Sequence, residues 1–197
     1  MNRELVSIPE LLKEYILKEG KVLGNGILKV DSFMNHQINP ALHMEIGRYF
    51  AELYIDKGIT KILTLESSGI APAFATAAAL GVPMVFARKK KPITMLEFWR
   101  ESAPSHTKGG VVEIYVSRDA LTERDTILIV DDFLATGLSI AALARIVQVS
   151  GARLVGIAAI IEKTFEHGRD LLTSFHRIQI QSAVRITKLS ESGIAFD

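Results

Sequence analysis

The sequence predicts an α/β protein in which a central, mainly parallel sheet carries helices on both faces. Short apolar runs alternate along the chain with segments of helical periodicity, and this alternation is typical of βαβ units. The 197 residues, 48% of them hydrophobic, are enough to bury the core of one domain. No repeat, linker or low-complexity segment divides the chain, so residues 1–197 are expected to form a single domain.

Local signals place the elements in order. Ser7 and Glu10 form a capping box at the start of the first helix. Apolar residues recur on one helical face from Pro40 to Lys57, and Gly58 ends that helix. The alternation then predicts strands at 27–33, 61–66, 82–88, 126–130 and 153–162, and helices to about residue 18, at 40–57, within 67–81 and at 137–149.

Composition and charge exclude several classes of protein. The net charge is +1, so nothing indicates a nucleic-acid or membrane partner, and the absence of cysteine excludes disulfides and thiolate metal sites. The five histidines include no i, i+4 ligand pair. No apolar run reaches the roughly 20 residues that cross a bilayer, and the acidic N-terminus is unlike a signal peptide. We therefore expect a cytoplasmic protein.

Residues 89–110 interrupt the alternation. This segment contains a lysine run, two prolines, the aromatic residues Phe98 and Trp99, and a double glycine. A long irregular segment within an α/β domain is usually either functional or disordered. Two interpretations stay open: a solvated surface loop, and a lid that closes over an anionic ligand.

The main functional signal is the stretch TILIVDDFLATG, residues 126–137. An apolar run leads directly into Asp131 and Asp132, and ligands of open α/β sheets bind at the carboxyl ends of strands. Two carboxylates there need hydroxyl donors, cations or water. The small and hydroxyl residues that follow lead into a helix, whose first amides suit a phosphate. The motif predicts a site for a ribose 5-phosphate, and the alternative is a surface Asp–Asp pair before an ordinary helix N-cap.

The stretch ILIVDDFLATGLS (127–139) resembles the phosphoribosyl-diphosphate motif of type I phosphoribosyltransferases. Further segments are similar to the branch of that family that uses xanthine, namely 29–40, 58–73, 80–91 and 161–170. The resemblance implies the type I fold, with a base-binding hood formed by residues 20–40 and 163–197 and with a flexible loop. It also implies transfer of 5-phosphoribosyl from 5-phospho-α-D-ribose 1-diphosphate to N9 of xanthine, in a homodimer.

The resemblance further implies roles for individual residues. Asp131 and Asp132 engage the ribose hydroxyls and stabilise the positive charge that develops on the sugar. Magnesium is expected on the diphosphate, held mainly by phosphate oxygens and waters rather than by protein ligands. The implied ligands of the donor are Ala135, Thr136, Gly137, Leu138, Ser139, Ser67, Ser68, Gly69, Arg88 and Lys89, and those of xanthine are Leu28, Asn35 and Lys163.

Simpler interpretations of these residues stay open. SSGIAP (67–72) also reads as a capped helix start, Leu28 as a core strand residue, Asn35 as a turn residue and Lys163 as a surface charge. Phe133, beside the acidic pair, has two interpretations, contact with the base and packing in the core, and core packing is the one expected.

Two other functions also stay open. One is the same transfer to guanine, hypoxanthine or adenine. The other is a purine-sensing transcription regulator with a phosphoribosyltransferase-like domain. Such a regulator needs a DNA-binding domain before the matched region, and the roughly 20 residues there are too few for one.

Overall fold

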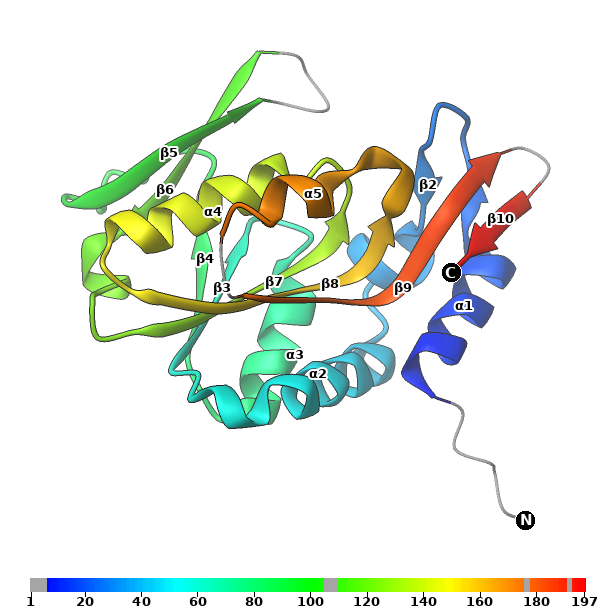
Figure 1. The fold of residues 1–197 in the computed structure, drawn as a ribbon, viewed down its shortest axis with the longest axis horizontal. Helices are drawn as coiled ribbons and strands as arrows, with labels where there is room; N and C mark the ends of the chain where they lie inside the picture. Colours follow the sequence, from blue (N-terminus) through cyan, green and yellow to red (C-terminus); the bar gives the residue numbers. More distant parts are fainter. Residues whose placement is uncertain (1–6, 105–109, 176–177, 191–192) are drawn as a thin grey trace.

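A six-stranded sheet lies at the centre of this computed structural model, which describes residues 7–104, 110–175, 178–190 and 193–197 (Figure 1). The elements along the chain are α1 (Ile8–Glu19), β1 (Lys21–Val22), β2 (Leu28–Lys29), η1 (Asp31–Asn35), α2 (Pro40–Tyr54), η2 (Ile55–Lys57), β3 (Lys61–Leu65), α3 (Ile70–Leu80), β4 (Met84–Ala87), β5 (Phe98–Pro104), β6 (Val111–Ser117), η3 (Arg118–Ala120), β7 (Thr126–Leu134), α4 (Leu138–Val149), β8 (Arg153–Lys163), η4 (Thr164–Glu166), α5 (Gly168–Leu172), β9 (Gln179–Ser190) and β10 (Gly193–Phe196).

The strands of the central sheet follow the order β10-β9-β8-β7-β3-β4. The pairs β9–β8, β8–β7, β7–β3 and β3–β4 are parallel, and β10 alone is antiparallel to its neighbour within this described sheet. The predicted α/β class is therefore confirmed. β3, β7 and β8 are buried along most of their length, which is why they appear in the sequence as continuous apolar runs.

Helices cover both faces of the sheet and form two cores. Figure 1 shows α2 and α3 below the sheet, and α4 and α5 above it. Alternate residues of β7 point into the two cores: Ile127 and Ile129 pack with α4, whereas Leu128 and Val130 pack with α2 and α3. The two-residue period of a strand thus distributes one apolar run between two helical layers.

The N-terminal segment and the C-terminal segment meet at one end of the sheet (Figure 1). A Cβ built on Gly26 would lie 3.3 Å from the ring of Phe165, and Leu28 and Ile186 belong to the same buried cluster. Residues from 20–40 therefore lie beside residues from 163–197, as a hood requires. The role of this hood in binding a base stays a prediction.

The predicted strand at 27–33 is wrong in its extent. Strand β2 covers two residues, and a π-helical turn, η1, replaces the rest. Phe33 and Met34 are neighbours and both are buried. A strand would point neighbouring side chains to opposite faces, so the single core available here favours a helical turn over the β propensity of the segment.

The predicted irregular segment 89–110 is also partly wrong. Its residues Phe98–Pro104 form β5, which pairs with β6 in an antiparallel hairpin. Arg145 on α4 donates from Nε to Glu101 at 3.0 Å, and the Trp99 indole donates to the Leu121 carbonyl at 3.1 Å. The first contact holds the hairpin against α4, and the second holds it to the segment that follows η3. Residues 105–109 lie outside the described part of the chain, and the lid interpretation depends partly on them.

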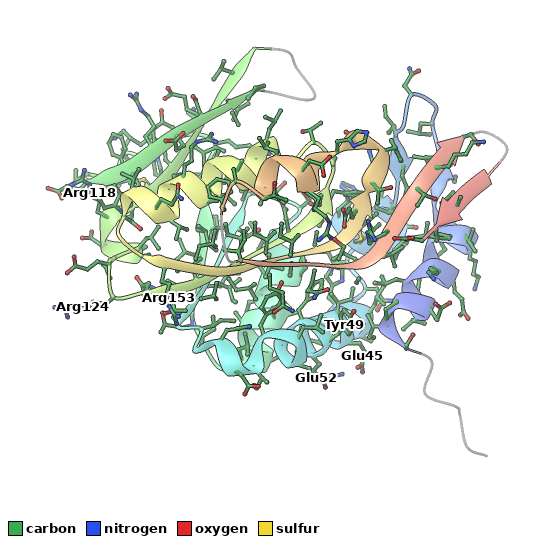
Figure 2. All side chains as sticks on the ribbon, in the orientation of Figure 1. Glu45, Tyr49, Glu52, Arg118, Arg124 and Arg153 are labelled. Carbon is green, nitrogen blue, oxygen red and sulfur yellow. The ribbon has the colours of Figure 1, made fainter. Side chains whose placement is uncertain are left out.

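Exposed arginines lie at the end of the sheet where β7 and β8 begin. Figure 2 shows Arg118, Arg124 and Arg153 there, at the opposite end from the carboxyl ends of these strands. Arg118 stacks at 4.2 Å from the ring centroid of Trp99, and Arg153 donates to the Lys57 carbonyl at 3.3 Å. Arg118 and Arg153 therefore brace local structure, away from the predicted site. None of the described helices is both long and apolar enough to cross a membrane.

Candidate active site

The site lies where the chain connections of the sheet diverge. β3 leads through α3 to β4 on one side, while its neighbour β7 leads through α4 to β8 on the other side. β3 and β7 pair up to Leu63 and Ile129, and beyond these residues the two strands separate. Such a divergence opens a crevice outside the carboxyl ends of the strands, where ligands of α/β proteins bind.

A cavity of about 310 Å³ occupies this crevice. It brings together residues from four of the predicted groups: the acidic pair, the loop that follows it, the segment after β3 and the segment after β4. The lining residues are Leu65, Glu66, Ser68, Lys89, Asp131, Asp132, Phe133, Ala135, Thr136, Gly137, Leu138, Ser139 and Ile140. Of the predicted donor ligands, Ser67, Gly69 and Arg88 are outside this lining.

The two acids lie within β7, which continues to Leu134 instead of ending at Val130 as predicted. The Asp132 amide donates to Oδ1 of Asp131 at 3.0 Å, and both side chains are almost fully buried. Burial raises the pKa of Asp131, and the adjacent charge of Asp132 raises it further. A carboxyl held in this way is suited to a ligand that donates hydrogen bonds to its ionised form.

Binding of the predicted phosphoribosyl donor is expected to release a proton from Asp131. Ribose hydroxyls that donate to the carboxylate stabilise its charged form, so the raised pKa of the free protein falls in the complex. Affinity for 5-phospho-α-D-ribose 1-diphosphate should therefore increase as pH rises toward that raised pKa. Calorimetry in buffers of different ionisation enthalpy measures the number of protons released on binding. The number released with the Asp131→Asn variant comes from the ligand and other groups, so the difference between the two proteins gives the contribution of Asp131. Equal proton release by both proteins would contradict this linkage.

The two helices that begin at the cavity lack side-chain caps. Ser7 caps α1 through the Glu10 amide and Asn39 caps α2 through the Leu42 amide, at 3.5 and 3.2 Å. In contrast, the N-cap residues of α3 and α4 are Gly69 and Gly137, and no described side chain caps either helix. Gly137 has φ of 75°, which a glycine adopts without strain. The first amides of α3 and α4 can therefore bind anionic groups at the positive helix ends.

Glu66 joins the segments after β3 and β4. Its carboxylate accepts the Lys89 amide at 2.7 Å and lies 2.8 Å from Nε of Arg88. The Arg88 guanidinium also lies over the ring of Phe86, with 5.4 Å to the centroid. Lys89 thus lines the cavity, whereas Arg88 is turned to its rim.

The predicted base ligands are less closely grouped. Lys163 lies over the ring of Phe133 at 5.6 Å and 3.1 Å from Glu166, beside the cavity that Phe133 lines. Leu28 is buried in the hood core, which fits the simpler interpretation of this residue. Asn35 is half-buried at the end of η1. The expectation that Phe133 serves the core is incomplete, because its ring also borders the cavity.

Comparison with known proteins shows which family the chain belongs to. The model of the phosphoribosyl transferase domain matches residues 34–182. The chain belongs to the phosphoribosyltransferase family. It is 49% identical over 187 residues to the xanthine phosphoribosyltransferase of Brevibacillus brevis, covering 94% of each chain, and 47% identical to that of Listeria innocua, covering 95% of this chain and 97% of the relative. A phosphoribosyltransferase is a transferase, so this chain is a transferase as well.

The fold agrees with solved members of the family. The adenine phosphoribosyltransferase of Rhodothermus marinus superposes with a TM-score of 0.74 at 26% identity, covering 90% of this chain and 98% of that one. The predicted type I fold is confirmed.

Sequence patterns missed two contributors to the site. Glu66 lies within the predicted diphosphate loop, residues 65–69, but a role there is predicted only for Ser67, Ser68 and Gly69, because no motif separates Glu66 from an ordinary loop acid. Gly168 is distant in the sequence from the predicted phosphate loop, residues 135–139, but contacts it in the fold. A Cβ on Gly168 would lie 2.0 Å from the Ala135 carbonyl oxygen. Its sequence signal is its place in the segment 161–170, which resembles the family but does not indicate a contact with the phosphate loop.

Proposed function

We propose that this phosphoribosyltransferase transfers 5-phosphoribosyl from 5-phospho-α-D-ribose 1-diphosphate to N9 of xanthine, giving xanthosine 5′-monophosphate and diphosphate in purine salvage. The observation that carries the proposal is identity of 47–49% with xanthine phosphoribosyltransferases over nearly the whole chain. The cavity at the end of β3 and β7 supports it, because acids, amides and a lysine line one space there.

The donor would occupy the cavity with its 5-phosphate at the start of α4. The amides from Ala135 to Ser139 bind the phosphate, and Asp131 and Asp132 accept hydrogen bonds from the ribose hydroxyls. As the bond to the diphosphate breaks, positive charge develops on the sugar, and the two carboxylates stabilise it electrostatically. The chain supplies no nucleophile in this scheme; it positions the two substrates and stabilises charge.

The diphosphate would lie toward α3. The segment Ser67–Gly69 contributes hydroxyls and amides at an uncapped helix start, and the Lys89 ammonium lies near enough to neutralise the leaving group. Arg88 requires a side-chain movement to reach the same cavity, because Glu66 and Phe86 hold it at the rim.

The donor set fits a magnesium ion that binds together with the diphosphate. In this proposal Asp131 and Asp132 face the ribose hydroxyls, and no group of three or more metal-ligating side chains converges within the described residues, so the diphosphate and waters would be the main ligands of the ion. Magnesium in such sites keeps waters and takes oxygens from the substrate phosphates. When bound, the ion would neutralise charge on the diphosphate.

The base would lie between the hood and the end of β8. Lys163 would donate to an oxo group of xanthine, and the Phe133 ring offers an apolar face below that lysine. Asn35 would contact the base from η1. Leu28 supports the same region from within the hood core.

Rates with the four purine bases test the proposal. Xanthine is expected to have the highest kcat/KM, and adenine, which lacks oxo groups, to fall at least about 10²-fold lower because Lys163 would face no acceptor. Asn35→Ala should raise KM for xanthine about threefold to tenfold while leaving KM for the donor near its original value. A higher kcat/KM with guanine, hypoxanthine or adenine than with xanthine would refute the assignment of the base.

We also propose that the enzyme is a homodimer. Ile38 and Phe74 are large exposed apolar residues, and both border an apolar hollow of about 400 Å³ between α2 and the start of α3. Ser67 of the diphosphate loop lines the same hollow, so a second copy seated there would lie next to the site.

The cytoplasmic location stays a prediction.

A further inference from the structure

The segment between β8 and β9 forms one wall of the phosphate loop. A Cβ on Gly168 would lie 2.0 Å from the Ala135 oxygen and 2.6 Å from the Gly137 nitrogen. A Cβ on Gly137 would in turn lie 2.6 Å from the Gly168 oxygen. The two backbones are therefore in direct contact, and the position of residues 164–172 sets the shape of the loop that is proposed to bind the 5-phosphate.

One buried carboxylate holds this segment to the sheet. Glu162 is 2% exposed near the end of β8 and accepts from Nε of Arg169, in α5, at 2.8 Å. A terminal nitrogen of Arg169 contacts the other oxygen of the same carboxylate, so the pair is bidentate. Arg169 also donates to the Ile180 carbonyl at 3.0 Å, and Ser182 donates to Glu162 at 2.7 Å, so α5 is joined to both β8 and β9.

The electrostatics of the pair favour a fixed geometry. Burial alone raises the pKa of Glu162, but hydrogen bonds from Arg169 and Ser182 and the charges of Arg169 and Arg185 outweigh it and hold that pKa below its usual value. A buried ionised carboxylate is stable only while its partners stay in place. Arg169 is therefore confined to one position, and Gly168, its neighbour in α5, is confined with it.

We propose that Arg169 and Glu162 are a positioning pair for the 5-phosphate of the donor. Neither side chain lines the cavity. The pair acts through the backbone of Gly168, which holds Ala135 and Gly137 where their amides meet the phosphate. On the base side, Lys163 precedes this segment and lies over the ring of Phe133 in β7, so it keeps one contact that does not depend on residues 164–172. This inference rests on the proposed function for its ligand.

Arg185 provides a matched control. Its Nε lies 3.4 Å from Oε2 of Glu162, the oxygen that also accepts from Ser182, and its guanidinium pairs with Asp197. It belongs to β9, and among the described residues its ion pairs do not include the 164–172 segment. Removing Arg185 therefore takes one positive charge from Glu162 without releasing α5.

The experiment compares Arg169→Met, Arg169→Lys and Arg185→Met at a temperature well below their unfolding transitions. Arg169→Met is expected to raise KM for the donor, and its calorimetric Kd with magnesium, about 10- to 100-fold, with a much smaller change in KM for xanthine. Arg169→Lys keeps the positive charge but cannot form the bidentate pair of the guanidinium. Its KM for the donor should therefore lie between those of the wild type and Arg169→Met. Arg185→Met should lower Tm and leave both KM values within about twofold.

Two results would overturn the positioning role. One is an Arg169→Met protein that has a lower Tm and an unchanged KM and Kd for the donor. The other is an equal loss of donor affinity in Arg185→Met, which would indicate general weakening around Glu162. Because donor binding is measured without a base, this comparison remains decisive even if wild-type enzyme fails to use xanthine, a result that would refute the proposed function alone.

Discussion

Replacing both Asp131 and Asp132 by Asn is expected to lower kcat/KM for phosphoribosyl transfer by at least about 10²- to 10³-fold. Both carboxylates line the cavity, and Asn has nearly the same volume, so the double variant removes charge without leaving a void. The loss should appear mainly in kcat, since the charge on the sugar develops in the transition state. Steady-state rates with xanthine and donor measure it.

Asp125→Asn is the matched control for this loss. Asp125 directly precedes β7 at the opposite end from the cavity, where Lys61 lies 2.9 Å from its carboxylate and the Thr122 amide donates to it at 2.8 Å. This variant should lose stability and keep its kinetic constants. Wild-type kinetics in the Asp131→Asn, Asp132→Asn protein, or an equal loss in Asp125→Asn, would remove the acidic pair from the mechanism.

Asp131 and Asp125 should also differ in how they change the stability of the folded chain with pH. The pKa of Asp131 is raised in the folded chain, above the value of about 3.9 for an unfolded Asp, so the folded state holds its proton longer and stability falls as pH rises through this interval. The pKa of Asp125 is lowered: burial opposes this, but the Thr122 amide and Lys61 outweigh burial. Its stabilisation is present at neutral pH and is lost as pH falls. Asp131→Asn should therefore raise Tm at neutral pH, while Asp125→Asn lowers it.

The alternation of elements was predictable because the strands of the parallel sheet are buried on both faces and the helix caps are local. Ser7, Asn39 and Gly58 act within a few residues of their own positions. Where the prediction failed, a distant partner decides the structure. Phe33 and Met34 turn into one core formed with α1 and α2, and β5 exists because β6 pairs with it and Arg145 holds it on α4.

The same distinction separates the predicted from the missed parts of the site. Asp131 to Ser139 form one contiguous motif, so their convergence on a ligand follows from the strand and helix that flank them. Glu162, Arg169 and Gly168 act on that motif across a gap of about thirty residues in the chain, and this contact depends on the crossover between β8 and β9. An acid at the end of a long apolar run, followed seven residues later by an arginine, is a signal that further sequences could test.

Gly69→Ala is expected to lower kcat/KM about 10²-fold, although the backbone of Gly69 has an ordinary helical conformation that Ala adopts readily. A Cβ at this position would lie 2.2 Å from the hydroxyl of Thr64 and 2.5 Å from Oδ1 of Asp131. Thr64 is fully buried, so packing around it opposes a movement of its hydroxyl. The added methyl must therefore displace the Asp131 carboxylate or the start of α3, and either movement disturbs the ribose and diphosphate positions together.

Gly81→Ala separates this effect from simple loss of stability. Gly81 ends the same helix, has φ of 68°, and a Cβ on it would meet no atom within 4 Å. That variant carries backbone strain without touching the site, so it should lower Tm and keep KM for the donor. If Gly69→Ala binds donor with wild-type affinity and retains wild-type kcat, then the carboxylate of Asp131 does not need its present position, and the close approach of the diphosphate loop to β7 serves packing alone.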